Sequence, residues 1–294
     1  MVSLQLISLP SQQRMKINNV HRIECDFKPR LVLLISDVHF DNPKCDRALL
    51  KRHLDQAKEK GADILLNGDT FCLMQGAYDP RKSKNDIRPE HNVNNYLDAV
   101  IGTAIEYFGP YAHLIKVVGY GNHETSILKR AETDVIERFV SGMNIAHGSN
   151  IQAGGYGGWI VYEFRDKSRH RATWKIKYYH GSGGAAPVTL GTIQSNRMQV
   201  FVEGANMIWQ GHVHNDYELT YTVEQLSTMS HEIELRDVVH VRTATYKEEY
   251  NKGKGGWHVE RGAGPKPTGG RWLQLTPSLA NSASKVIGYT YKAQ

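Results

Sequence analysis

Residues 30–37 read RLVLLISD, an apolar run that ends abruptly in polar residues. Three later stretches have the same form: GADILLNGD at 61–69, HLIKVVGYGN at 113–122 and ANMIWQGH at 205–212. Each run is short and rich in Val, Ile and Leu, which is typical of strands that are buried on both faces of a sheet. We therefore predict four buried strands at these positions.

The segment between the first two runs, residues 42–61, is predicted to be a helix. Asn42 is a suitable N-cap, Pro43 suits the first helical turn, and Gly61 suits the position just past the end. Its apolar face would consist of Leu50, Leu54 and Ala57.

Two further helices are expected, one at about 92–108 and one after residue 124. The apolar stripe predicted for the later helix consists of Leu128, Ala131, Val135 and Phe139. Strands that alternate with helices indicate an α/β fold. After about residue 150, stretches such as GGWIVYEF and ATWKIKYYH alternate apolar and polar residues, which favours antiparallel strands or a second sheet.

Length and composition suggest one folded domain. The chain has 294 residues, of which 40% are hydrophobic, so a sizeable core is possible. No stretch resembles a long interdomain linker. We expect a single domain over 1–294, with a motif-bearing core at 30–215 and with strands and a Gly-rich loop at 216–294.

The sequence gives no sign of membrane insertion or of a disulfide framework. It contains no apolar run of 18 residues and no signal-peptide pattern, so we expect a soluble, cytoplasmic protein without a membrane partner. Its three cysteines, Cys25, Cys45 and Cys72, are odd in number and scattered. The net charge of +6 permits a nucleic-acid partner without implying one, and the oligomeric state is left open.

Residues that can bind metal follow the buried runs and one later strand. They are Asp37, His39, Asp69, Asn122, His123, His180, His212 and His214. In an open α/β sheet the carboxyl ends of the strands line one crevice, where residues distant in sequence meet. Residues i and i+2 of an extended chain also point to the same side, so each D-x-H and H-x-H pair is expected to reach one centre.

The number and type of these side chains fit two metal ions better than one. Two carboxylates, four imidazoles and one carboxamide exceed the needs of one four-coordinate ion. They suit a pair of ions roughly 3.5–4 Å apart that share one carboxylate. Nitrogen and oxygen ligands without thiolate favour Mn, Fe or Zn. Such a centre keeps a net positive charge that suits a phosphate group, and a hydroxide held between the ions would attack phosphorus in line.

The ordered set D-x-H, G-D, G-N-H-E, H and G-H-x-H resembles the calcineurin-like metallophosphoesterase family, over roughly residues 30–215. The resemblance implies two mixed β-sheets packed as a sandwich and flanked by helices. It implies two divalent ions, with Mn²⁺ expected first and Fe, Zn, Ni or Mg as alternatives. One ion would be held by Asp37, His39, Asp69 and His214, with Asp69 bridging. The other would be held by Asp69 together with Asn122, His180 and His212.

The same resemblance implies roles for two neighbouring residues. His123 would steady the phosphoryl oxygen or protonate the leaving group. Glu124, where many members carry Asp, would orient His123. Cys72 directly follows the G-D-T-F motif, and we expect it to pack beside the metals rather than to bind them.

The substrate is less well defined than the reaction. Arg81, Lys82 and Arg88 lie between the second and third motifs, where they are candidates to bind a second phosphate or a nucleic-acid backbone, although a solvated surface loop explains them equally well. The motifs NGDTFCLM and GYGNHE differ from those of the protein-phosphatase branch. They are closer to the repair-nuclease and small phosphodiesterase branches, and to stand-alone phosphoesterases that are common in phage and bacterial genomes.

We therefore predict a metal-dependent phosphodiesterase, with a DNA exonuclease or endonuclease as the sharper hypothesis. The alternative is a phosphoesterase that acts on a nucleotide or another small molecule, phosphomonoesters included. A degenerate metal-binding module without catalysis is a third possibility, which the complete set of motifs disfavours.

Overall fold

The four apolar runs are strands, as predicted, but they belong to two different sheets. The first three form neighbouring parallel strands β2 (Arg30–Ile35), β3 (Asp63–Asn67) and β4 (Ile115–Gly119). The fourth, β8 (Met207–Gln210), lies in the second sheet. The computed structural model describes residues 19–75, 79, 82–83, 86–168, 170–184, 186–228, 230–254, 257–260, 262–280 and 283–294.

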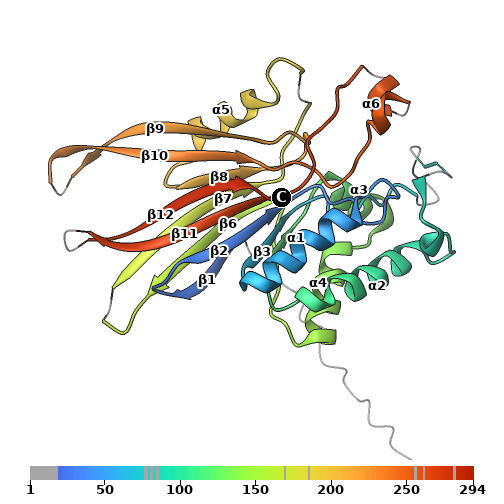
Figure 1. Ribbon diagram of the computed structural model, residues 1–294, viewed down its shortest axis with the longest axis horizontal. Coiled ribbons are helices and arrows are strands. Elements are labelled where there is room, and N and C mark those ends of the chain that lie inside the picture. The colour runs from blue at the N-terminus through green and yellow to red at the C-terminus, as the bar shows by residue number, and fades with distance from the viewer. Residues whose placement is uncertain are drawn as a thin grey trace, which may run out of the picture.

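Each sheet is mixed and has six strands (Figure 1). The first has the order β12-β11-β2-β3-β4-β5 and the second has the order β1-β6-β7-β8-β10-β9. The remaining strands are β1 (Val20–Asp26), β5 (Gln152–Ala153), β6 (Gly157–Arg165), β7 (Arg171–Tyr179), β9 (Tyr217–Ser227), β10 (Glu232–Arg242), β11 (Arg271–Ala280) and β12 (Ala283–Lys292). The expected α/β sandwich of two mixed sheets flanked by helices is confirmed, and so are the antiparallel strands β6 and β7.

The strand register explains why these runs are apolar without alternation. Leu34, Leu65 and Val117 pair across β2, β3 and β4 and belong to the core between the two sheets. Leu33 and Ile35 of β2 belong instead to the core under the helices. Both faces of β2, β3 and β4 are therefore buried, which a continuous apolar run satisfies.

The first predicted helix exists but starts later than expected. Helix α1 (Arg47–Lys60) is capped by Asp46, whose carboxylate accepts a hydrogen bond from the Leu49 amide at 2.8 Å. Asn42 is not its N-cap, because its side chain closes a local turn with the Lys44 amide. Gly61 ends the helix in the left-handed conformation, φ 60°, as predicted.

The stripe predicted after residue 124 is wrong, because two helices replace one. Helix α3 (Asn122–Ala131) ends at Glu132, which has φ 49°, and Asp134 then caps α4 (Val135–His147). Leu128 is consequently 40% exposed, whereas Val135 and Phe139 of α4 are buried.

The other helices cover the two outer faces of the sandwich. Helix α2 (Tyr96–Phe108) matches the second predicted helix and joins α1 and α4 on the first sheet, while α5 (Thr192–Phe201) lies against the second sheet through Met198 (Figure 1). Short helical turns are η2 (Pro89–His91), η3 (Gly109–Tyr111), η4 (Asn251–Gly253) and α6 (Trp257–Glu260). No helix in the described ranges combines the length and the apolar character needed to span a membrane.

Residues after 215 complete both sheets. Strand β11 pairs with β2 in the first sheet, and β10 pairs with β8 in the second. The strands that carry the D-x-H and G-H-x-H motifs therefore depend on the C-terminal part of the chain for one neighbour each.

Candidate metal centre

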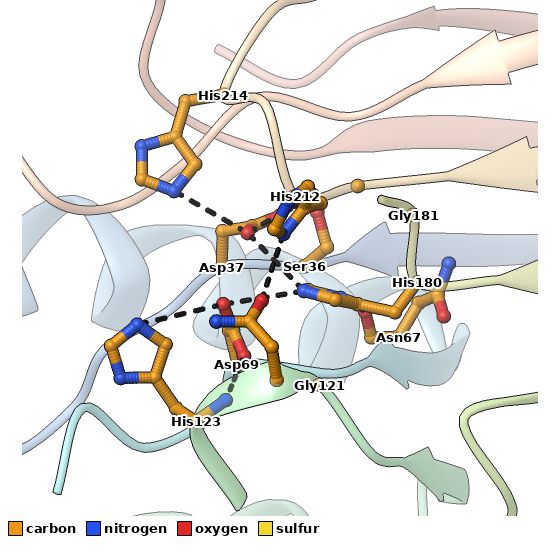
Figure 2. A network of polar contacts seen from close by, with 12 residues as sticks. Ser36, Asp37, Asn67, Asp69, Gly121, His123, His180, Gly181, His212 and His214 are labelled. Carbon is orange, nitrogen blue, oxygen red and sulfur yellow. Dashed lines mark hydrogen bonds and ion pairs between the residues drawn. The ribbon is translucent and has the colours of Figure 1, made fainter. Parts of the chain in front are cut away.

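The predicted ligands meet in one place, where strands β2, β3, β7 and β8 end and helix α3 begins (Figure 2). Two groups can each hold a metal ion, because their ligand atoms lie within 4.8 Å of one another. The first group is Asp37, His39 and His214, and the second is Asp69, His180 and His212. Asn122 adjoins the second group, with its Oδ1 2.8 Å from His212 Nδ1. The two groups share one crevice, since Asp37 Oδ1 is 3.9 Å from His180 Nε2.

The ligand-bearing loops have an unusual backbone. Five residues of the two groups have positive φ: Asp37 at 52°, His39 at 50°, Asp69 at 47°, His212 at 74° and His214 at 57°. This conformation costs on the order of 1 kcal/mol or more for a residue with a side chain, and such strain gathers at functional sites. The side chains therefore converge through left-handed turns beyond the strand ends, and the predicted i, i+2 geometry of an extended chain is wrong.

Hydrogen bonds between the loops hold this strained backbone. The amides of Asp37 and His39 donate to the carbonyls of Gly68 and Asp69, at 3.1 and 3.0 Å. The His212 amide donates to the Asp37 carboxylate, at 2.9 Å to Oδ2. These hydrogen bonds join the D-x-H motif to the G-D motif and to the G-H-x-H motif.

His180 is buried beside the carboxylates of the centre. It is completely buried, and its Nδ1 donates to the carbonyl of Asn67 at 2.8 Å. Its Nε2 is buried without a hydrogen bond, 3.2 Å from Asp69 Oδ2. Burial lowers the pKa of His180, but Asp69 and Asp37 outweigh it and raise this pKa to about 10. The carboxylates thus favour a cation at Nε2, and a divalent ion would take the place of the proton.

The first group also brings imidazole nitrogens and a carboxylate close together. Nε2 of His39 lies 3.4 Å from Nε2 of His214, and the latter lies 3.4 Å from Asp37 Oδ1. Burial, followed by the charges of His123 and Lys247, holds the pKa of His39 well below its usual value, so this ring is neutral. Two imidazoles and a carboxylate close to one another form a donor set that suits Mn, Fe or Zn.

His123 lies beside the centre and is held by backbone. Its amide donates to Asp69 Oδ1 at 3.0 Å, and its Nδ1 donates to the carbonyl of Cys72 at 2.5 Å. Its Nε2 is 3.9 Å from Asp69 Oδ2 and is turned toward the two carboxylates (Figure 2). The residue also lines the cavity described below.

Glu124 does not orient the ring of His123 as predicted. Its carboxylate accepts hydrogen bonds from the backbone amides of Asp69, Phe71 and Gly121, at 3.1, 2.9 and 2.8 Å. Burial, followed by the nearby Asp69, raises the pKa of Glu124 to about 8. Glu124 therefore fixes the Asp69 loop to the start of α3, and it affects His123 only through that backbone.

Cys72 lies close to the first group, but its thiol is not suited to bind metal. It forms a cluster with His39 and His123 within 4.8 Å, and its sulfur accepts a hydrogen bond from Asn42 at 3.4 Å. Burial raises the pKa of the thiol to about 12, which disfavours the thiolate that metals bind. Packing beside the metals remains the role we predict for it.

A cavity of about 760 Å³ lies over the centre. Its walls include His123 and five residues of the predicted ligand set, together with Lys44, Lys247 and Lys266. These three lysines lie outside the sequence motifs, and only the tertiary fold brings them to the site. Lys247 follows Thr245 and Tyr246, which both donate to the carbonyl of Asp37.

The predicted substrate-binding residues do not line this cavity where the structure describes them. Arg88 turns inward and donates to the carbonyls of Asn42 and Cys45 at 3.0 and 3.1 Å. Its guanidinium therefore fixes the loop before α1 instead of facing the cavity. Lys82 is exposed and is not among the lining residues, and Arg81 lies outside the described residues.

Comparisons with known proteins show distant structural similarity only. No family model and no curated protein matches the chain. The fold is similar to vacuolar protein sorting 29 from Cryptosporidium parvum, with 13% identity, a TM-score of 0.36, and coverage of 90% of this chain and 100% of that one. It is also similar to GAP50, the anchor in the inner membrane complex of Plasmodium, with 9% identity, a TM-score of 0.43, and coverage of 90% and 88%. Both TM-scores are below 0.5, so the chemistry of the site rests on this chain's own residues.

Proposed function

We propose that the chain is a metal-dependent phosphoesterase that hydrolyses a phosphodiester at a pair of divalent ions. The observation that carries this proposal is the pairing of two ligand groups in one crevice, each with a carboxylate and two imidazoles. Nε2 of His180 is buried 3.2 Å from Asp69 Oδ2 and 3.9 Å from Asp37 Oδ1, and a ring nitrogen beside two carboxylates fits a bound cation.

In this proposal Asp37, His39 and His214 hold one ion, and Asn122, His180 and His212 hold the other, with Asp69 between them. When bound, two such ions provide a water of lowered pKa and offset the negative charge that develops on phosphorus. We prefer Mn²⁺ for the mixed N and O ligands, and Fe, Zn, Ni and Mg remain alternatives.

The role of His123 follows from its fixed ring. Because its Nδ1–H is donated to a carbonyl, Nε2 is the nitrogen available to a substrate. A protonated Nε2 would donate to a phosphoryl oxygen or to the leaving oxygen, and such proton transfer contributes typically 10²–10⁴-fold in rate.

The ester is proposed only as a class. A nuclease is our first choice and a phosphoesterase that acts on a nucleotide or small molecule is the second. The cavity of about 760 Å³ also supports the second choice, because its volume is typical of sites that hold a small ligand.

The test replaces Asp69 by Asn and measures metal content and the hydrolysis of bis-p-nitrophenyl phosphate with added Mn²⁺. We expect Asp69→Asn to lose bound metal and nearly all activity, because the residue serves both groups. Asp26→Asn removes the same charge from an exposed surface ion pair and should keep both.

Two results would contradict the proposal in different ways. Full metal content with full activity in Asp69→Asn would rule out the two-ion centre. A parent protein that binds two ions yet hydrolyses no diester, monoester, cyclic nucleotide or DNA would instead be a metal-binding module.

A further inference from the structure

Of the described lysines in the cavity wall, Lys266 is the one that has no carboxylate partner. Outside the predicted metal ligands, the described residues of the wall include three lysines, Lys44, Lys247 and Lys266, and two carboxylates, Asp86 and Glu249. Lys44 lies 3.5 Å from Asp86, and Lys247 lies 2.7 Å from Glu249. Two of the three lysines are therefore neutralised by a carboxylate in the same wall.

Lys266 has a neutral partner instead. Its Nζ donates to the carboxamide Oδ1 of Asn215 at 2.8 Å, and within the described part of the chain no carboxylate forms an ion pair with it. The side chain is partly buried, and burial lowers the pKa of Lys266 without any acidic group to raise it. A partly desolvated ammonium with one neutral partner retains the capacity to bind an anion.

The position of Lys266 is fixed relative to the centre. Asn215 directly follows His214, is 6% exposed, and donates from its own Nδ2 to the carbonyl of Leu190 at 2.7 Å. The Lys266 ammonium is thus hydrogen-bonded to Asn215, the residue that follows the predicted metal ligand His214. Lys266 and the predicted ligands line the same cavity, so an anion at Lys266 would share that cavity with a phosphate at the centre.

We propose that Lys266 binds a second phosphate group of the substrate, next to the phosphodiester that is cleaved. This inference rests on the proposed function, and it narrows the substrate class to esters that carry two neighbouring phosphates. Either a nucleic-acid strand or a pyrophosphate ester offers that chemistry.

The experiment compares two dinucleotides that differ by one phosphate. The first, d(TpT), contains only the diester, and the second, d(pTpT), adds a neighbouring 5′-phosphate. We expect the parent protein, loaded with Mn²⁺, to show a kcat/KM about tenfold higher for d(pTpT), as one charge-assisted contact implies. Lys266→Met and Lys266→Gln should reduce that ratio toward one, whereas Lys266→Arg should keep most of it.

A matched control separates this effect from a general loss of positive charge. Lys58→Met removes one charge from the exposed end of α1 and should leave the ratio unchanged. Metal content and thermal unfolding of each variant show whether the fold and the centre are intact. ADP-ribose serves as the pyrophosphate arm: a larger loss with ADP-ribose than with d(pTpT) in Lys266→Met supports a pyrophosphate ester, and the reverse supports a nucleic-acid strand.

The outcomes distinguish this inference from the proposed function. If d(TpT) is hydrolysed but d(pTpT) is not preferred, or if Lys266→Met keeps the preference, the role of Lys266 is wrong and the phosphodiesterase stands. If no diester is hydrolysed by the metal-loaded protein, both proposals fail.

Discussion

Three histidines at the centre are fixed in the same way but present different nitrogens. Each ring has one nitrogen at hydrogen-bond distance from a backbone carbonyl, so that the other nitrogen faces the crevice. The carbonyl-bonded nitrogens are Nδ1 of His123, Nδ1 of His180 and Nε2 of His212. His180 therefore offers Nε2 and His212 offers Nδ1, and these are the nitrogens that would hold an ion in the proposed centre.

His123 differs from the other two because its proposed role is to act on the substrate. We expect His123→Ala to keep its bound metal and to lose about 100-fold or more in kcat on bis-p-nitrophenyl phosphate. His113→Ala, which alters an exposed histidine before β4, should match the parent protein in both measurements. Unchanged turnover in His123→Ala would remove His123 from the reaction.

At the scale of the elements, two glycines allow the ligand loops to come close together. A Cβ on Gly121, at the start of α3, would overlap the Asp69 carboxylate and its backbone nitrogen. A Cβ on Gly211, just after β8, would lie 2.5 Å from Asp37 Oδ2. The glycines of G-N-H-E and G-H-x-H are thus required by contact between loops.

Gly121→Ala should therefore damage the centre more than the fold. We expect a loss of at least about tenfold in Mn²⁺ affinity, measured by calorimetric titration, because Asp69 must move. Gly61→Ala is the comparison: it has φ 60° and nothing within 4 Å of the added Cβ. It should cost about 1 kcal/mol in urea unfolding and leave metal affinity unchanged. Equal metal affinity in both variants would mean that the Asp69 loop adapts.

The sequence predicts the elements well where a local pattern and its physical cause coincide. The apolar run of β2 is buried on both faces, and Gly61 is needed in a left-handed position. The residues that the ordered motifs mark as ligands lie close together in the fold. The failures have two causes. Asp46 caps α1 in place of Asn42 because Asn42 closes its own local turn, and Glu124 binds the amides of a loop that is distant in sequence.

Some features of the site left no local pattern in the sequence. The left-handed turns at the predicted ligands are held by hydrogen bonds from other motifs, and the modest preference of Asp and His for this conformation does not locate them in the sequence. Lys266 reaches the cavity through Asn215, a residue 51 positions earlier in the chain. Such contacts depend on the tertiary fold.

At the scale of the whole molecule, the motif-bearing part of the chain shares both sheets with the strands that follow residue 215. A chain that ends at residue 215 retains all predicted ligands, but it loses β11 beside β2 and β10 beside β8. Leu273 and Leu275 of β11 and Val241 of β10 also leave the core between the sheets. We expect residues 1–215 to show no cooperative urea transition and no stoichiometric Mn²⁺ binding. Cooperative unfolding of that shorter chain would show that the C-terminal strands are dispensable.

Two buried histidines should make the whole fold sensitive to acid. His53 of α1 lies 2.8 Å from the hydroxyl of Tyr246, and His240 of β10 donates to Gln199 of α5 at 2.8 Å. Burial lowers the pKa of each to about 4, from 6.5. Both contacts join segments that are far apart in sequence, so protonation of either ring opposes the folded state of the whole chain.

The direction of the pH effect follows from these two values. Above pH 6.5 both rings are neutral in the folded and the unfolded chain, so neither His53 nor His240 lowers the free energy of unfolding there. Between pH 6.5 and about 4 the unfolded chain binds protons that the folded chain does not bind. Each histidine therefore lowers the free energy of unfolding by up to about 3 kcal/mol. Urea unfolding of the chelator-treated protein across this range, which avoids effects of metal release, should show the loss. The double variant His53→Gln, His240→Gln should flatten the pH dependence, and His113→Gln should not. A double variant as acid-sensitive as the parent protein would place the loss elsewhere, for example at His21 or His91, whose pKa values burial also lowers.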